Sequence, residues 1–261
     1  MAYLIVCLVA LLVAALTLFS GFGLGTLLMP AFALFFPVPV AVAATAVVHL
    51  ANNLFKLGLV GRHADRTTVI RFGVPAAVAA IVGALVLNLT SALPPLTTYV
   101  LRDQTHAITP VKLIVGLLIL AFALFDLIPK LAGMTFDQRY LPLGGALSGF
   151  FGGLSGNQGA MRSAFLLKLG LDKQAFVGTG VVTAVIVDVT RLLIYGLAFF
   201  TVNVTAFDPS VVGLVLAATV AAFVGSFLGA RLLTKVTLRT VQIIVGILLM
   251  ALGVGMAAGL V

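Results

Sequence analysis

The sequence predicts an all-α integral membrane protein, and its composition and the length of its apolar runs support this fold class. Of the 261 residues, 62% are hydrophobic and 8% are charged, and the mean hydropathy is +1.27. A soluble domain carries roughly a quarter charged residues, so the composition excludes one. A transmembrane β-barrel needs short segments of alternating polarity, whereas stretches 111–124 and 241–254 are apolar on every face.

The apolar runs predict about eight transmembrane helices, because a bilayer-spanning helix needs about 20 apolar residues. We expect them at 3–35, 40–60, 72–90, 111–128, 140–169, 174–200, 210–230 and 240–259. The first and fifth runs are too long for one straight span, and glycine-rich stretches interrupt them at 21–25 (GFGLG) and 152–159 (GGLSGNQG). Each interruption predicts a broken helix. The polar connection 90–110 is expected to be a surface loop.

The two breaks recur at a fixed spacing, which indicates an internal repeat. Gly25 and Gly159 are 134 residues apart. A shift of 135 residues aligns two polar pairs in the helices that follow, Asn53 with Asp188 and Lys56 with Arg191. We therefore expect one membrane domain of two four-helix repeats, 1–128 and 138–261, joined by a loop at 129–137. An even number of spans per repeat predicts parallel copies related by a pseudo-twofold axis along the membrane normal.

Polar residues at helical spacing form a stripe on each of two predicted spans. One stripe comprises Thr45, His49, Asn52, Asn53 and Lys56, and the other comprises Asp188, Arg191 and Tyr195. Ionisable groups are costly in hydrocarbon and turn towards a cavity or a partner, so one interpretation is that the stripes line a substrate pathway. The other is that Asp188 and Arg191 neutralise each other, while Lys56 extends from its helix end to the headgroups.

The broken helices favour binding of an oxyanion. A helix start exposes unpaired N–H groups and the positive end of the helix dipole, and Arg162 follows the second break within one turn of Gly159. Small residues also serve plain helix packing in membranes, which is the alternative for both breaks. The predicted substrate-binding residues are Gly23, Gly25, His49, Asn52, Asn53, Lys56, Ser155, Asn157, Gln158, Arg162, Asp188 and Arg191.

The sequence carries no recognisable catalytic, cofactor or metal motif. The stretch 153–157 (GLSGN) lacks the last glycine of a nucleophile elbow and its strand-turn-helix context, and the three histidines lie too far apart for a helical metal pair. Two alternatives to a permease remain open, a membrane-embedded enzyme acting on a lipid phosphate and a structural or assembly factor. Such an enzyme needs buried acidic groups, yet the sequence has no Glu, and Asp188 is its clearest acid within a span.

The formal charge of +8 comes from basic residues that stand singly at the ends of apolar runs. There they set membrane topology, so nucleic acid is not an expected partner, whereas membrane lipid and a small anion are. Cys7 is expected to be a packing residue within the first helix, which lacks the basic start of a cleavable signal peptide and is expected to be retained. The sequence does not predict the oligomeric state.

Several short motifs resemble the TauE/SafE family of sulfite and organosulfonate exporters. They are stretch 21–25 followed by Met29 and Pro30, and stretch 225–233 (GSFLGARLL) followed by Leu238 and Arg239. The resemblance covers essentially the whole chain and implies a permease of the bacterial or archaeal inner membrane that moves small sulfur oxyanions or sulfonates. Such anions suit N–H donors together with Arg or Lys. The second break, 155–163 (SGNQGAMRS), departs from the family's glycine pattern and lacks its proline.

The energy source is expected to be the membrane potential or a proton gradient, because no nucleotide-binding loop of the Walker type is present. His49 and Asp188 are the buried proton-coupling candidates. For orientation, the predicted spans place Arg102, Lys112, Lys168, Lys173, Arg231, Lys235 and Arg239 on one side and Arg62, Arg66, Arg71, Lys130 and Arg139 on the other. The close cluster at 231–239 predicts a cytoplasmic turn, so both termini are expected to face outward.

Overall fold

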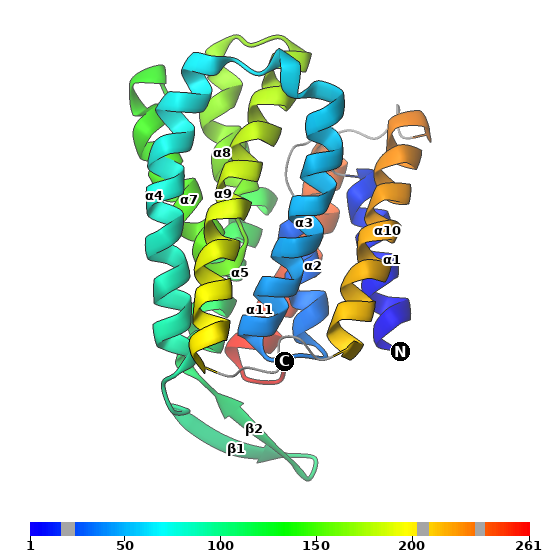
Figure 1. Cartoon of the computed structure of the whole chain (residues 1–261). Coiled ribbons are helices and arrows are strands. Elements are labelled where there is room, and N and C mark those ends of the chain that lie inside the picture. The colour runs from blue at the N-terminus through cyan, green and yellow to red at the C-terminus, as the bar shows by residue number, and fades with distance from the viewer. Residues whose placement is uncertain (17–23, 203–208, 233–237) are drawn as a thin grey trace.

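The computed structural model describes residues 1–16, 24–202, 209–232 and 238–261, which form a helical bundle with a protruding β-hairpin (Figure 1). The elements are α1 Ala2–Leu16, α2 Leu24–Ala33, α3 Val38–Val60, η1 Gly61–His63, α4 Arg66–Ser91, β1 Thr97–Leu101, β2 Gln104–Ile108, α5 Pro110–Leu127, α6 Pro129–Ala132, η2 Gln138–Tyr140, α7 Leu141–Ser155, α8 Gly159–Leu166, η3 Leu167–Leu169, α9 Lys173–Val202, α10 Pro209–Leu232 and α11 Leu238–Ala257.

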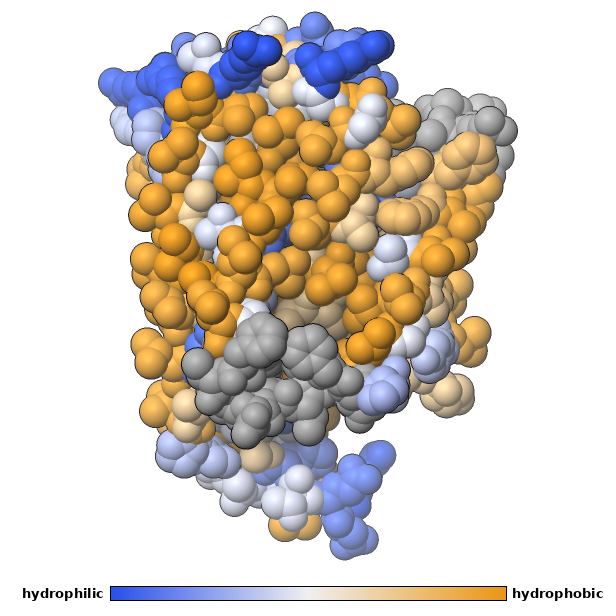
Figure 2. Space-filling view, viewed as in Figure 1, coloured by the Kyte–Doolittle hydropathy of each residue, from blue (hydrophilic) through white to orange (hydrophobic). Residues whose placement is uncertain are grey.

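The surface of the bundle confirms the predicted class, an all-α membrane protein. A broad apolar belt lies between two polar ends (Figure 2). Four helices, α3, α4, α9 and α10, are long and apolar enough to cross a membrane, and α1, α2, α5 and α11 contain shorter apolar stretches. An apolar belt of this kind matches the hydrocarbon layer of a bilayer.

The two polar ends of the bundle are named here by their connections, the η1 face and the hairpin face. At the η1 face, Asp65 caps α4 by accepting a hydrogen bond from the Thr68 N–H (2.7 Å). The same interaction holds the pKa of the Asp65 carboxyl below its usual value. The Asp65 N–H donates to Thr179 Oγ1 (2.9 Å), so α9 begins on the same face as α4.

Two pairs of helices run parallel and pack closely through glycine. Glycines of α7 contact α4 in order, with Gly145 against Phe72 and Gly149 against Ala76. The helix α10 contacts α1 in the same manner, through Gly225 against Leu11 and Gly229 against Ala15. Because α4 begins at the η1 face, α7 begins there too. Because α10 follows α9 and begins at the hairpin face, α1 also begins at the hairpin face.

The helices α7 and α8 form a hairpin that enters and leaves the bundle at one face. The ring of Phe136, just before α7, stacks on that of Phe165 near the end of α8, with centroids 4.3 Å apart. Gly144 of α7 also contacts the Phe165 ring. The segment of α1 and α2 also begins and ends at one face, the hairpin face. The helix α1 begins there, and α2 ends at the short connection 34–37, which leads to the start of α3 (Figure 1).

These hairpins correct the predicted topology. The expected spans 3–35 and 140–169 do not cross the bundle, whereas α3 to α5 and α9 to α11 do (Figure 1). The predictions of eight crossing segments and of parallel copies are therefore wrong, because a re-entrant hairpin and a broken span have the same hydropathy. The predicted copies 1–128 and 138–261 begin on opposite faces, so any repeat relation between them is inverted. Of the first predicted break, 21–25, residues 21–23 with Gly23 lie outside the described residues, and Leu24 and Gly25 stand at the start of α2.

The connection 90–110 lies at the surface as predicted, but it contains the antiparallel hairpin of β1 and β2. Tyr99 and His106 are paired across the strands, and their rings stack with centroids 5.5 Å apart. The Tyr99 hydroxyl donates to the Ala258 carbonyl (2.6 Å). Both ends of the chain therefore lie at the hairpin face (Figure 1).

The close packing of α4 on α7 predicts that Gly149→Ala lowers stability. A Cβ at Gly149 would lie 2.0 Å from the Ala76 carbonyl oxygen, so the helices must move apart, at a cost of about 1–3 kcal/mol. Gly58→Ala is the matched control, because nothing lies within 4 Å of its added Cβ and alanine favours a helix. Thermal unfolding of both purified variants checks this. Equal melting temperatures would contradict the packing argument.

Candidate functional site

The candidate site lies where the two interrupted helices meet inside the bundle. A Cβ at Gly25, near the start of α2, would lie 3.0 Å from the carbonyl oxygen of Gly156, at the turn between α7 and α8. Gly156 has φ +84°, in the left-handed region, which glycine adopts at little cost. The chain reverses there and starts α8. The N-terminal ends of two short helices, α2 and α8, thus converge in the interior.

The carboxylate of Asp188 on α9 is the centre of a buried hydrogen-bond cluster. Its Oδ2 accepts from His49 Nδ1 (2.6 Å) and Asn53 Nδ2 (3.3 Å) on α3. Its Oδ1 accepts from Gln158 Nε2 (3.0 Å) at the α7–α8 turn, and from Nε (3.1 Å) and Nη2 (2.7 Å) of Arg191. Three elements far apart in sequence are thus joined at one fully buried carboxylate.

Arg191 also connects α9 to the end of α7. Its Nη1 donates to the Gly152 carbonyl (3.1 Å), and the Tyr195 hydroxyl donates to the Gly153 carbonyl. The Gly152 carbonyl also accepts from the Gly156 N–H (3.0 Å), and a cation at the C-terminal end of a helix is favourable. The mutual neutralisation of Asp188 and Arg191, one of the two interpretations of the sequence, is therefore present, and it positions the α7–α8 turn.

Three further polar side chains lie beside this cluster, and each has either unpartnered hydrogen-bonding atoms or a positive charge. Asn157 is 3% exposed, and neither side-chain polar atom has a hydrogen-bond partner. Lys56 is 8% exposed, and no hydrogen bond or ion pair is formed by its ammonium among the described residues. Arg162 is bonded to Gln158 Oε1 (3.4 Å), and it lies close enough to Lys56 for their charges to repel.

Two predicted site residues have other partners. Asn52 Oδ1 accepts from Ser226 Oγ on α10 (2.9 Å), away from Asp188. Ser155 Oγ donates to the Phe151 carbonyl of its own helix (3.1 Å). Ser148 is not among the predicted residues, yet its Oγ donates to the Gln158 carbonyl (2.8 Å) and supports the turn. A serine on the glycine-rich face of α7 was the available signal.

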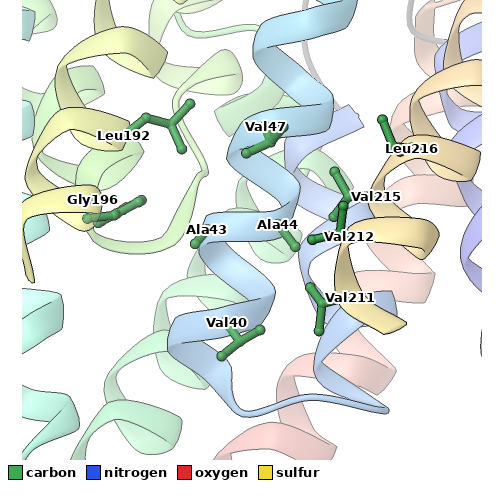
Figure 3. A pocket seen from close by; sticks show the side chains of 11 residues that line it. Val40, Ala43, Ala44, Val47, Leu192, Gly196, Val211, Val212, Val215 and Leu216 are labelled. Atoms are coloured by element: carbon green, nitrogen blue, oxygen red, sulfur yellow. The ribbon is translucent and has the colours of Figure 1, made fainter. Parts of the chain in front are cut away.

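An apolar groove lies between α3, α9 and α10, in the half of the bundle nearer the hairpin face (Figure 3). Its volume is about 340 Å³. The lining side chains are Val40, Ala43, Ala44, Val47, Leu192, Tyr195, Gly196, Val211, Val212, Val215 and Leu216. The groove offers an anion almost no polar group, so the charged chemistry is confined to the turn and to the half nearer the η1 face.

The apolar belt, the re-entrant hairpins and the buried charged centre together define a polytopic membrane transporter. Comparison with family models gave a match to the sulfite exporter TauE/SafE family over residues 6–256. The chain therefore belongs to the TauE/SafE family, a family of transporters and not of enzymes. Comparisons with curated proteins and with solved structures gave no match.

The Asp188 cluster predicts that Arg191→Met is strongly destabilising. Removing one partner leaves a buried carboxylate without its counter-charge, which costs about 3–5 kcal/mol. Adding Asp188→Asn to this variant removes that charge and is expected to restore part of the stability. Thr190→Ala is the control, because its hydroxyl bonds only the Ile186 carbonyl of its own helix. Thermal unfolding in detergent measures all three, and an unchanged melting temperature for Arg191→Met would refute the interpretation.

Proposed function

We propose that this transporter exports a small sulfur oxyanion, sulfite or an organosulfonate, across the cytoplasmic membrane. The observation that carries the proposal is the charge of the site. Among the described side chains, the buried charged groups are three cations, Lys56, Arg162 and Arg191, and one carboxylate, Asp188. A buried excess of positive charge is costly unless an anion compensates it.

The converging helix ends support the same substrate. The N-terminal turn of α8 directs N–H groups and the positive end of its dipole to the site, and Gly25 of α2 lies beside the same turn. The unpartnered amide of Asn157 adds a donor between α7 and α8. A tetrahedral oxyanion accepts hydrogen bonds in several directions, so N–H donors and cations arranged around a small site suit it.

Export of an anion needs no chemical energy source in this proposal. An inside-negative membrane potential favours outward movement by about 2.3 kcal/mol per charge per 100 mV, so a uniporter suffices. If a proton is coupled, His49 and Asp188 are the groups that carry it. His49 Nδ1 lies 2.6 Å from the carboxylate, while the other edge of the ring faces Gly25 at the start of α2. Protonation at Nε2 would add positive charge beside the substrate.

The opposite orientations of the two hairpins support an alternating-access mechanism. In transporters with inverted repeats, the substrate site lies at the midplane between the repeats, and the site opens to each side in turn. Here α7 and α8 enter from the η1 face, whereas α1 and α2 enter from the hairpin face. We infer that the Asp188 cluster moves as one body with the α7–α8 turn. Gln158 of the turn bonds the Asp188 carboxylate, and Arg191 bonds both that carboxylate and the Gly152 carbonyl.

A flux assay in proteoliposomes tests the function. Purified protein is reconstituted, and uptake of labelled sulfite, sulfate, thiosulfate, taurine and sulfoacetate is measured. Asn157→Ala is expected to lower flux by about tenfold or more, the effect of losing a hydrogen bond to a charged group, without loss of stability, since the side chain bonds nothing in the protein. Thr219→Ala on α10 is the control, because its hydroxyl bonds the Val215 carbonyl. Absence of anion flux in folded wild-type protein would disprove the proposal.

The distribution of basic residues supports an orientation in which the η1 face is cytoplasmic. Lys168 and Lys173 lie at this face, because α8 returns to it and α9 starts from it; the sequence analysis had placed them on the opposite side. They join the exposed residues Arg62, Arg66, Arg71, Lys130 and Arg139. Arg102 and Lys112 remain at the hairpin face, whereas the side chains of Arg231, Lys235 and Arg239 lie outside the described residues. The positive-inside rule then assigns the η1 face to the cytoplasm.

This orientation predicts that both termini lie outside the cytoplasm, because both lie at the hairpin face (Figure 1). A reporter active only in the cytoplasm is expected to stay silent when fused after Val261. The same reporter inserted between Gly170 and Leu171, in the connection before α9, is expected to be active. The reverse pattern, with both fusions expressed at equal levels, would invert the topology.

A further inference from the structure

The site has two levels along the direction from the hairpin face to the η1 face. His49 contacts Gly25 at the level of the helix ends. Lys56 lies seven residues further along α3, about 10 Å nearer the η1 face at 1.5 Å per residue. Arg162 lies four residues after Gln158 on α8, about 6 Å in the same direction. Lys56 thus lies at a second level beyond that of the helix ends, and Arg162, whose Nη1 bonds Gln158 Oε1, connects the two levels.

Lys56 differs from the other buried cations in forming neither an ion pair nor a side-chain hydrogen bond among the described residues. Arg191 is paired with Asp188 at 2.7 Å, and Arg162 is bonded to Gln158. Lys56 is 8% exposed, and among the described residues it forms no ion pair. The positive charge of Arg162 lies near enough to repel it. A buried ammonium in this setting is costly without an anion, so an anionic group at the second level would compensate Lys56.

Among the described side chains, the site has no unoccupied carboxylate oxygen to bind a cationic group. Asp188 is the one buried carboxylate among the described side chains, and both of its oxygens are occupied. Two donors bond Oδ2, and three bond Oδ1. A substrate ammonium would meet Lys56 and Arg162 at one level and the positive helix ends at the other. Neither level provides an acceptor with negative charge.

We infer that Lys56 is a specificity determinant that selects substrates with a second negative charge and excludes zwitterions. In this arrangement one anionic group is bound at the helix ends, and the second is bound by Lys56 beside Arg162. The favoured substrate is a sulfonate that also carries a carboxylate, or a doubly ionised oxyanion, and an aminosulfonate is rejected. The inference rests on the proposed anion transport and adds to it the charge of the substrate.

Three sulfonates with the same two-carbon frame test the inference in proteoliposomes. They are 3-sulfopropanoate, 2-hydroxyethanesulfonate and 2-aminoethanesulfonate, which end in a carboxylate, a hydroxyl and an ammonium. Wild-type flux is expected to fall in that order. Lys56→Met keeps the apolar stem and removes the charge, so it is expected to lower flux of the dianion by about tenfold or more relative to flux of the hydroxyl compound. Lys56→Arg is expected to retain the preference.

The control is Lys168→Met, because Lys168 is an exposed lysine at the η1 face. This variant tests a general effect of surface charge and is expected to preserve the order of the three fluxes. An equal loss for all three sulfonates in Lys56→Met, or equal wild-type transport of dianion and zwitterion, would overturn the inference while leaving anion transport intact. No flux of any anion in folded wild-type protein would instead overturn the proposed function. Competition by the three sulfonates against labelled sulfite in wild-type protein decides the order even if Lys56→Met does not fold.

Discussion

The burial of Asp188 is the constraint on which the rest of the site depends. An ionised carboxylate inside the bundle is tolerated only if donors and counter-charges surround it, and here the donors come from α3, from α9 and from the α7–α8 turn. Satisfying one carboxylate therefore fixes three segments that are far apart in sequence. The turn cannot shift without breaking the bonds of Gln158 and Arg191, so the position of the converging helix ends follows from that of Asp188.

Glycine packing makes this arrangement possible. The helix α7 lies close to α4 because Gly145, Gly149 and Gly153 place backbone against backbone, which brings its end deep into the bundle. There Gly156 turns the chain back at φ +84°, and carbonyls in the last turn of α7 accept from Arg191 and Tyr195. The small residues at the α4–α7 interface thus bring the polar groups of the break into the interior of the bundle.

Helical spacing predicts the two polar stripes, but not the path of the chain. His49 and Asn53 of the α3 stripe hydrogen-bond Asp188 of the α9 stripe. The adjacent Asn52 is turned by about 100° on its helix and bonds Ser226 on α10, which no spacing within one helix could show. A break in an apolar run has the same hydropathy whether the chain continues or returns. That ambiguity led to the parallel topology and to the wrong side for Lys168 and Lys173.

The charge of the site arises from a difference between positions that a shift of 135 residues aligns. On α9, Asp188 and Arg191 are an acid and a base three residues apart, and they neutralise each other. On α3 the aligned residues are Asn53 and Lys56, so an amide stands where the acid would be. The amide donates to Asp188 itself (3.3 Å) and leaves Lys56 without a carboxylate. One half thus holds the framework together, while the other supplies the uncompensated positive charge at which we propose that the anion binds.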